Sequence, residues 1–181
     1  MRKHLLLVVL LATLVACDKQ SSSSATSKSS SDAAVTSASS DLKMIDFVAT
    51  QDGAPLKIDA ALFDTDVAKQ FATAGKNSYV GNEKAIAEGK KKFNLFSCVA
   101  CHGGKGEGAV GPGLQGPNFR YAKNATNKGM FETIWHGTNG GMGAKGLGLM
   151  VPTDPKEGLK PDDVLKVIAY IRSNGTTTGN E

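Results

Sequence analysis

The sequence has few cysteines, few histidines and few long apolar runs, and each shortage excludes a class of protein. With three Cys and three His among 181 residues, no second Cys or Cys/His pair exists to complete a four-ligand zinc site. After the first residues, no apolar run is long enough to span a membrane. The chain also lacks internal repeats, and no cluster of Lys and Arg argues for nucleic-acid binding, so its basic balance is no evidence for that function.

The N-terminus has the pattern of an export signal. A short basic stretch precedes an apolar run from Leu5 to Val15, which is shorter than a membrane span. The run ends in Leu14-Val15-Ala16-Cys17, which resembles the lipobox of bacterial lipoproteins. This resemblance implies a signal peptide over residues 1–16 and a lipid-modified Cys17 that anchors the protein to a membrane. The alternative is an ordinary secretory signal that happens to end near Cys17.

The segment 17–43 is predicted to be a flexible tether. It is rich in Ser, Ala and Thr and has almost nothing apolar to bury. Asp18 resembles the signal that retains lipoproteins in the inner membrane of enteric bacteria, which slightly favours the periplasmic face of that membrane. Removal of Arg2 and Lys3 with the signal lowers the Lys and Arg count from 21 to 19, so the formal charge falls from +4 to +2.

The stretch Cys98-Val99-Ala100-Cys101-His102 is typical of a site for covalent attachment of a c-type haem. On one helical turn, Cys98 and Cys101 project to the same side and could form thioethers with two vinyl groups. His102 could then place an imidazole nitrogen on the iron. The other interpretations are a redox dithiol, a structural disulfide and half a zinc site. No βαβ pattern supports a thioredoxin-like dithiol. If Cys17 is acylated and the other two cysteines hold a haem, all three cysteines of the chain are accounted for.

The folded part is predicted to be one small domain, residues 44–175, followed by a disordered tail over 176–181. Helical periodicity and capping residues predict four helices besides the haem motif, over about 64–74, 82–97, 127–136 and 161–174. Gly89 lies inside the second of these, where it costs about 1 kcal/mol relative to alanine. A close helix–helix crossing would explain it, and a tolerated surface glycine is the alternative.

The residue that fills the sixth iron position decides what a haem does. Met142 is favoured because it lies in a glycine-rich loop free to approach a flat ligand closely. Met150 in the same loop is the main alternative, followed by His136. Met130 and an open site have the least support. Two further residues are predicted to contribute: Pro112, whose turn could offer a carbonyl to the second nitrogen of His102, and the only tryptophan, Trp135, which is expected to pack on or near the haem.

Together these features resemble the class I cytochrome c family. The resemblance rests on a helix with Gly89, the haem motif, a Gly-Pro-x-Leu turn at 111–114, a methionine loop and a final helix with Tyr170. It implies an all-α fold in which the first and last helices cross beside one covalently bound haem c. The resemblance implies that His102 and Met142 are the iron ligands and that Cys98 and Cys101 are the attachment points. It also implies that Pro112 supports His102.

A narrower resemblance is to cytochrome c-L, over roughly residues 46–173. It is carried by segments before the haem motif, by the turn at 111–114, and by the segments 129–134 and 165–172. Three features depart from that family: the lipid anchor, the segment 115–121, where the family has an aromatic-rich stretch, and residues 147–159, which look inserted after the methionine loop.

This narrower resemblance implies an electron carrier and not an enzyme. The donor would be a periplasmic quinoprotein methanol or alcohol dehydrogenase with pyrroloquinoline quinone, and the acceptor a downstream cytochrome or terminal oxidase. The alternatives are a lipid-anchored carrier unrelated to alcohol oxidation, and a haem enzyme or sensor with an open sixth site.

Overall fold

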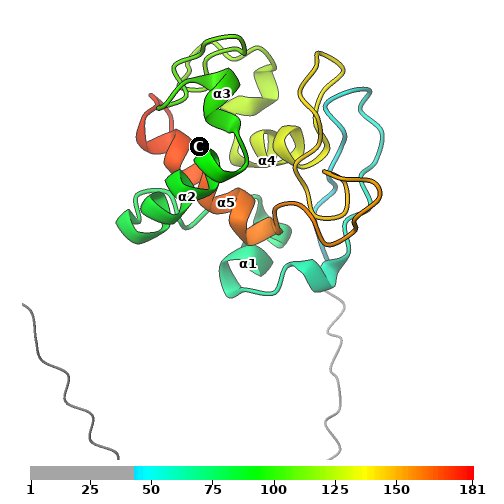
Figure 1. Ribbon diagram of the computed structural model, residues 1–181. Coiled ribbons are helices and arrows are strands. Elements are labelled where there is room, and N and C mark those ends of the chain that lie inside the picture. Colours follow the sequence, from blue (N-terminus) through cyan, green and yellow to red (C-terminus); the bar gives the residue numbers. More distant parts are fainter. Residues whose placement is uncertain (1–42) are drawn as a thin grey trace, which may run out of the picture. The chain divides into compact units, whose positions relative to one another are not determined.

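A computed structural model describes residues 43–181 of the chain (Figure 1). The predicted signal peptide, Cys17 and all but the last residue of the predicted tether lie outside the described residues. Within the described part, the chain forms α-helices and short 3-10 helices, with isolated β-bridges and no β-strand. None of these helices is long and apolar enough to cross a membrane. The elements are η1 (Ala60–Leu62), α1 (Asp66–Ala74), α2 (Glu83–Leu95), α3 (Cys98–His102), η2 (Ala122–Ala125), α4 (Asn127–His136) and α5 (Pro161–Ser173).

Local capping signals define the ends of these helices. The side chains of Thr65, Asn82 and Thr126 accept hydrogen bonds from backbone N–H groups in the first turns of α1, α2 and α4. Gly75 ends α1 in the left-handed conformation, and Pro161 occupies the first turn of α5. All four predicted helices are therefore confirmed, while η1 and η2 were not predicted.

Helices α2 and α5 cross in contact and form the centre of the domain (Figure 1). Gly89 lies at the crossing: a Cβ atom built on it would collide with the carbonyl oxygen of Lys166 and lie 2.5 Å from the carbonyl carbon. Only a residue without a side chain lets the two backbones approach so closely. The expectation of a close helix–helix crossing at Gly89 is thus confirmed.

The N-terminal end of α5 is joined to the preceding helices by a polar network around Asp162. This carboxylate accepts hydrogen bonds of 2.7 Å from the hydroxyls of Thr65 and Tyr79, and pairs with Lys166 at 3.0 Å. Lys166 also pairs with Glu88 of α2 at 2.8 Å. Burial acts to raise the pKa of Asp162, but these hydrogen bonds outweigh it and hold the pKa below its ordinary value.

An aromatic cluster joins the segment before α1 to α4. Phe47 packs against Phe71 and Phe131, with ring centroids 5.9 and 5.4 Å apart. Trp135 stacks on Phe131 at 5.5 Å with an interplanar angle of 13°. These rings are buried and form the core on the side of α4 that faces the N-terminal segment.

A buried carboxylate reinforces the same contact. Glu132, which is 1% exposed, pairs with Lys123 and Lys128 at 2.6 Å each and accepts a hydrogen bond from the backbone N–H of Val48. One acidic side chain thus joins η2, α4 and the N-terminal segment.

The tail 176–181, for which the sequence predicts disorder, forms defined hydrogen bonds in the structure. The Asn180 side chain exchanges hydrogen bonds with the backbone of Asn77 and accepts one from the Asn127 side chain. The backbone N–H of Asn127 donates to the carbonyl of Gly179 at 2.9 Å, and Gly179 is buried. Because the partners are about 50 and 100 residues away in the sequence, no local pattern revealed this contact.

Candidate functional site

The residues of the Cys-x-x-Cys-His motif form the short helix α3. Ser97 precedes it in the left-handed conformation, with φ of 59°, and separates α3 from α2. Cys98 is partly buried, Cys101 is exposed, and neither forms a disulfide. Burial raises the pKa of the Cys98 thiol. Among residues 43–181 no group of three or more His, Cys, Asp or Glu side chains is placed to hold a metal ion.

The side chain of His102 is held by the loop that follows α3. It is 7% exposed, and its Nδ1 lies 2.8 Å from the carbonyl oxygen of Pro112. When Nδ1–H donates to this carbonyl, Nε2 keeps its lone pair free for a metal. Gly111 permits the contact, because a Cβ there would lie 3.1 Å from His102 Cε1 and 3.2 Å from the carbonyl oxygen of Cys101.

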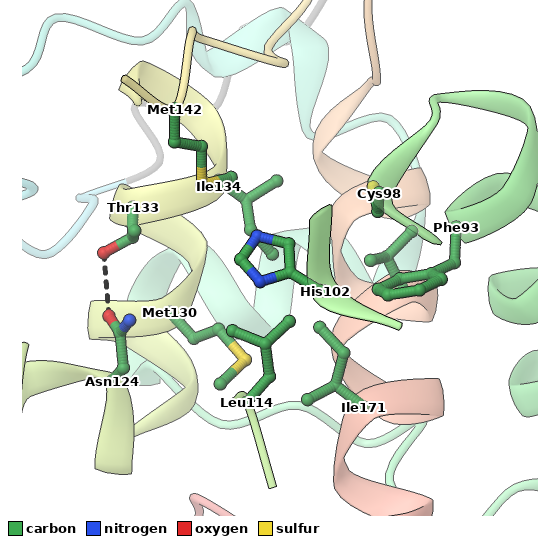
Figure 2. A pocket seen from close by; sticks show the side chains of 11 residues that line it. Phe93, Cys98, His102, Leu114, Asn124, Met130, Thr133, Ile134, Met142 and Ile171 are labelled. Atoms are coloured by element: carbon green, nitrogen blue, oxygen red, sulfur yellow. Dashed lines mark hydrogen bonds between the residues drawn. The ribbon is translucent and has the colours of Figure 1, made fainter. Parts of the chain in front are cut away.

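A cavity of about 510 Å³ opens beside α3. Its wall includes Cys98, Cys101, His102, Pro112 and Met142, so five of the predicted site residues meet at one place. A second, small apolar cavity of about 30 Å³ shares Cys98, His102 and Met142 (Figure 2). Cavities within the range of 300–1,000 Å³ are typical of cofactor sites.

Met142 belongs to a loop that is pinned to the end of α4. The backbone N–H of Thr138 donates to the Met142 carbonyl at 2.8 Å, and that of Lys145 donates to the Ile134 carbonyl at 3.0 Å. A Cβ on Gly137 would lie 2.5 Å from the Met142 carbonyl oxygen, so glycine is needed for this tight return.

The other candidate ligands are placed differently. Met130 lines the small cavity and is 2% exposed, whereas Met150 and His136 line neither cavity. Trp135 also lines neither cavity. Its ring stacks on Phe131 in the aromatic cluster and lies so close to Gly146 that a Cβ atom there would be 2.6 Å from the indole. The structure therefore gives no contact that would place Trp135 on a group bound in the cavity.

Polar residues in the wall were not predicted from the sequence. Asn124 of η2 and Thr133 of α4 both line the cavities, and the Thr133 hydroxyl donates to Asn124 Oδ1 at 2.7 Å (Figure 2). Thr50, from the segment before α1, lies 2.8 Å from the same hydroxyl. The apolar face expected for this helix did not include Thr133, and the short η2 segment has no periodic pattern. Only the folded chain therefore shows that these two residues form a pair.

The charged residues in the wall of the larger cavity are both cationic, Arg120 and Lys145. Val110 lies in the same wall and is 91% exposed. The open side of the cavity thus combines an exposed apolar side chain with positive charge.

Comparisons with known proteins agree with this geometry. The family described as cytochrome c matches residues 86–175. Cytochrome c-L of Methylorubrum extorquens is 38% identical over 109 residues, which are 60% of this chain and 50% of that protein. The chain therefore spans about half the length of this curated relative.

Two solved structures are similar over a larger share of their length. Cytochrome cL from Hyphomicrobium denitrificans has 38% identity and a TM-score of 0.60, over 71% of this chain and 73% of that chain. Cytochrome cL from the marine methylotroph Methylophaga aminisulfidivorans has 32% identity and a TM-score of 0.60, over 71% of this chain and 79% of that chain.

The fold and site thus define a c-type cytochrome, and the chain belongs to the cytochrome c family. The relatives that it matches within this family are cytochromes c-L. The expectation of an all-α class I cytochrome c fold is confirmed, and a cytochrome c domain implies one covalently bound haem c. The residues present fit that group: two free thiols, an imidazole oriented by a carbonyl and a thioether share one cavity.

Proposed function

We propose that this protein is a mono-haem electron carrier that accepts single electrons from a quinoprotein methanol or alcohol dehydrogenase and passes them toward a terminal oxidase. The observation that carries the proposal is the 38% identity to cytochrome c-L in a domain whose cavity brings His102 and Met142 together. Membership of the cytochrome c family supports an electron-transfer protein over an enzyme.

The residues of the cavity divide the task of holding the haem. Cys98 and Cys101 would each add a thiol across one vinyl group, and both thiols are free. His102 would ligate the iron through Nε2, while its Nδ1–H donates a hydrogen bond to the carbonyl oxygen of Pro112. Met142 would supply the sixth ligand. A haem held by these residues would supply one-electron chemistry between Fe(III) and Fe(II).

The apolar residues beneath the cavity keep water away from the bound group. Phe93, Leu114, Ile134 and Ile171 line the small cavity together with Met130 (Figure 2). A low local dielectric strengthens electrostatic effects on the redox equilibrium. The potential of a haem bound against this wall would therefore be sensitive to nearby charges.

The cationic, partly apolar mouth of the cavity supports docking to an acidic partner surface. Arg120 and Lys145 would steer the approach of carboxylates, and the exposed Val110 in the same wall offers an apolar contact. Such steering weakens as salt screens exposed charges.

We further propose that the protein is anchored at the periplasmic face of a bacterial membrane, the inner membrane being favoured. The support is the sequence alone: the lipobox-like ending at Cys17, followed by Asp18 and a tether without apolar residues. Anchoring would confine the carrier to the surface where its donor and acceptor meet.

Stopped-flow reduction tests the function. Oxidised haem protein, in a Cys17→Ser form without lipid, is mixed with reduced, purified quinoprotein methanol dehydrogenase. We expect saturable reduction with a second-order rate constant that falls as ionic strength rises. At the same ionic strength, Arg120→Gln and Lys145→Gln should each have a lower rate constant than the wild type. Lys91→Gln, which removes an exposed charge on α2 outside the cavity wall, is the matched control. Absence of reduction at saturating dehydrogenase would overturn the proposed donor.

A further inference from the structure

Arg172, near the end of α5, is buried although it carries a full charge. It is 5% exposed. Its Nε donates to Asn127 Oδ1 at 3.0 Å, and its Nη2 donates to the carbonyls of Asn124 and Ala125 at 2.7 and 3.2 Å. Its Nη1 donates to the hydroxyl of Thr177 at 3.3 Å. Burial lowers the pKa of Arg172, but a guanidinium starts so high that it stays protonated at physiological pH.

The guanidinium of Arg172 forms no ion pair within the described residues. Within residues 43–181, no Asp or Glu carboxylate forms an ion pair with its guanidinium. Glu181 is the carboxylate that acts on this charge from a distance, but it is exposed to water, which screens its field, and it is bound by Thr178. Each hydrogen-bond partner of Arg172 is a neutral oxygen, so the positive charge is solvated by the protein but not cancelled.

The C-terminal tail covers the guanidinium. Gly179 lies so close that a Cβ there would be 2.6 Å from Nη2 and 2.7 Å from Nε. Water is thereby kept from the group, and its field is screened less than that of a surface cation.

Arg172 lies directly behind the wall of the large cavity. Its guanidinium carbon is 5.5 Å from the ring centroid of Phe119, which lines that cavity. It also holds Asn124, which lines both cavities, through the backbone carbonyl. Ile171, its neighbour on α5, lines the small cavity. One layer of residues therefore separates an uncancelled positive charge from the redox site.

We propose that Arg172 raises the reduction potential of the haem site through its buried, uncompensated charge. Uptake of one electron from a donor lowers the charge of the site by one unit, so a fixed cation nearby favours the reduced state. This inference rests on the proposed electron-carrying function. Arg172 acts here as a positioning and tuning residue and touches no reacting atom.

The test is the midpoint potential of the intact haem protein, measured by spectroelectrochemistry at pH 6. Arg172→Gln removes the charge but keeps a polar side chain, and we expect the equilibrium constant for reduction to fall roughly threefold to tenfold, tenfold being 59 mV for one electron. Arg172→Lys keeps the charge and loses the fork of donors, so its potential should stay near that of the wild type. The exposed Lys91→Gln controls for net charge.

A second pair of variants leaves Arg172 in place, in case its replacements do not fold. Thr177 is on the tail, within hydrogen-bond distance of the guanidinium, and is partly exposed. Thr177→Asp would cancel the charge and lower the potential, while Thr177→Asn should leave it unchanged.

The two pairs of variants also separate an electrostatic role from a structural one. Equal potentials in Thr177→Asp and Thr177→Asn, or equal shifts in Arg172→Gln and Arg172→Lys, would overturn the proposal and make Arg172 structural. These measurements need no partner protein. A dehydrogenase that fails to reduce the wild type would therefore overturn the proposed donor without affecting them.

Discussion

Replacing Gly89 by alanine tests the helix crossing on which the site is built. The added Cβ would lie 2.5 Å from the carbonyl carbon of Lys166, whereas non-bonded carbon atoms prefer about 3.5 Å or more. Helices α2 and α5 would have to separate by about 1 Å, and since the obstacle is backbone, no side-chain rotation relieves it. Overpacking of this kind costs up to about 3 kcal/mol. Better helix propensity returns about 1 kcal/mol, so we expect a net loss of about 2 kcal/mol.

The assay is unfolding of the haem protein followed by far-ultraviolet circular dichroism, with heat and with urea. A loss of about 2 kcal/mol corresponds to a midpoint lowered by about 5–10 °C in a domain of this size, with an unchanged urea slope. Ala87→Gly is the matched control, because Ala87 is exposed on the same helix and isolates the propensity effect of about 1 kcal/mol. If Gly89→Ala is as stable as the wild type or more so, the crossing is not as close as described.

Three further predictions concern the supports of the site and its anchoring. Glu132→Gln leaves two lysines on one neutral side chain, and should lower the free energy of unfolding by about 2 kcal/mol or more in urea titrations; an unchanged midpoint would contradict the role of this buried carboxylate. The lowered pKa of Asp162 contributes stability that is complete above its unfolded pKa of about 3.9 and is lost as pH falls through the folded pKa. The stability difference between wild type and Asp162→Asn should therefore be largest near pH 6 and shrink below pH 4, and a difference independent of pH would refute this. Cys17→Ser should move the protein from the membrane fraction to the soluble fraction of cells, and retention in membranes would argue against lipidation.

Motifs that act through neighbours in sequence were predictable. The haem motif, the N-cap of Asn82 and the stop at Gly75 each depend on groups within one turn. Gly89 was predictable for a different reason: a glycine inside an otherwise good helix needs an explanation, and a close backbone is the usual one. The all-α architecture followed from these local signals and from the resemblance to class I cytochromes c.

Contacts between distant, short, polar segments were not predictable. Thr50 lies 83 residues from Thr133, and nothing in either segment indicates their contact. The tail contains no apolar residue, so its composition indicated disorder, yet Asn180 binds two other asparagines. Backbone and amide hydrogen bonds hold it, and these leave no hydrophobic pattern in a sequence.

Trp135 shows the same limit for an apolar residue. Its position on the inner face of a helix was predicted, but two apolar sites compete for such a face, the cavity and the aromatic cluster. The ring stacks on Phe131 and lines neither cavity, and only the packing of the N-terminal segment decides this.

The most direct test of the account is the electronic spectrum of the haem protein in two single variants. With His102 and Met142 on the iron, the oxidised wild type should show the far-red charge-transfer band of a methionine–iron bond, and the reduced protein should bind carbon monoxide poorly. Met142→Ala should lose the band and bind carbon monoxide readily, whereas Met150→Ala, whose side chain lines neither cavity, should keep the wild-type behaviour. A band that survives in Met142→Ala and disappears in Met150→Ala would contradict the account.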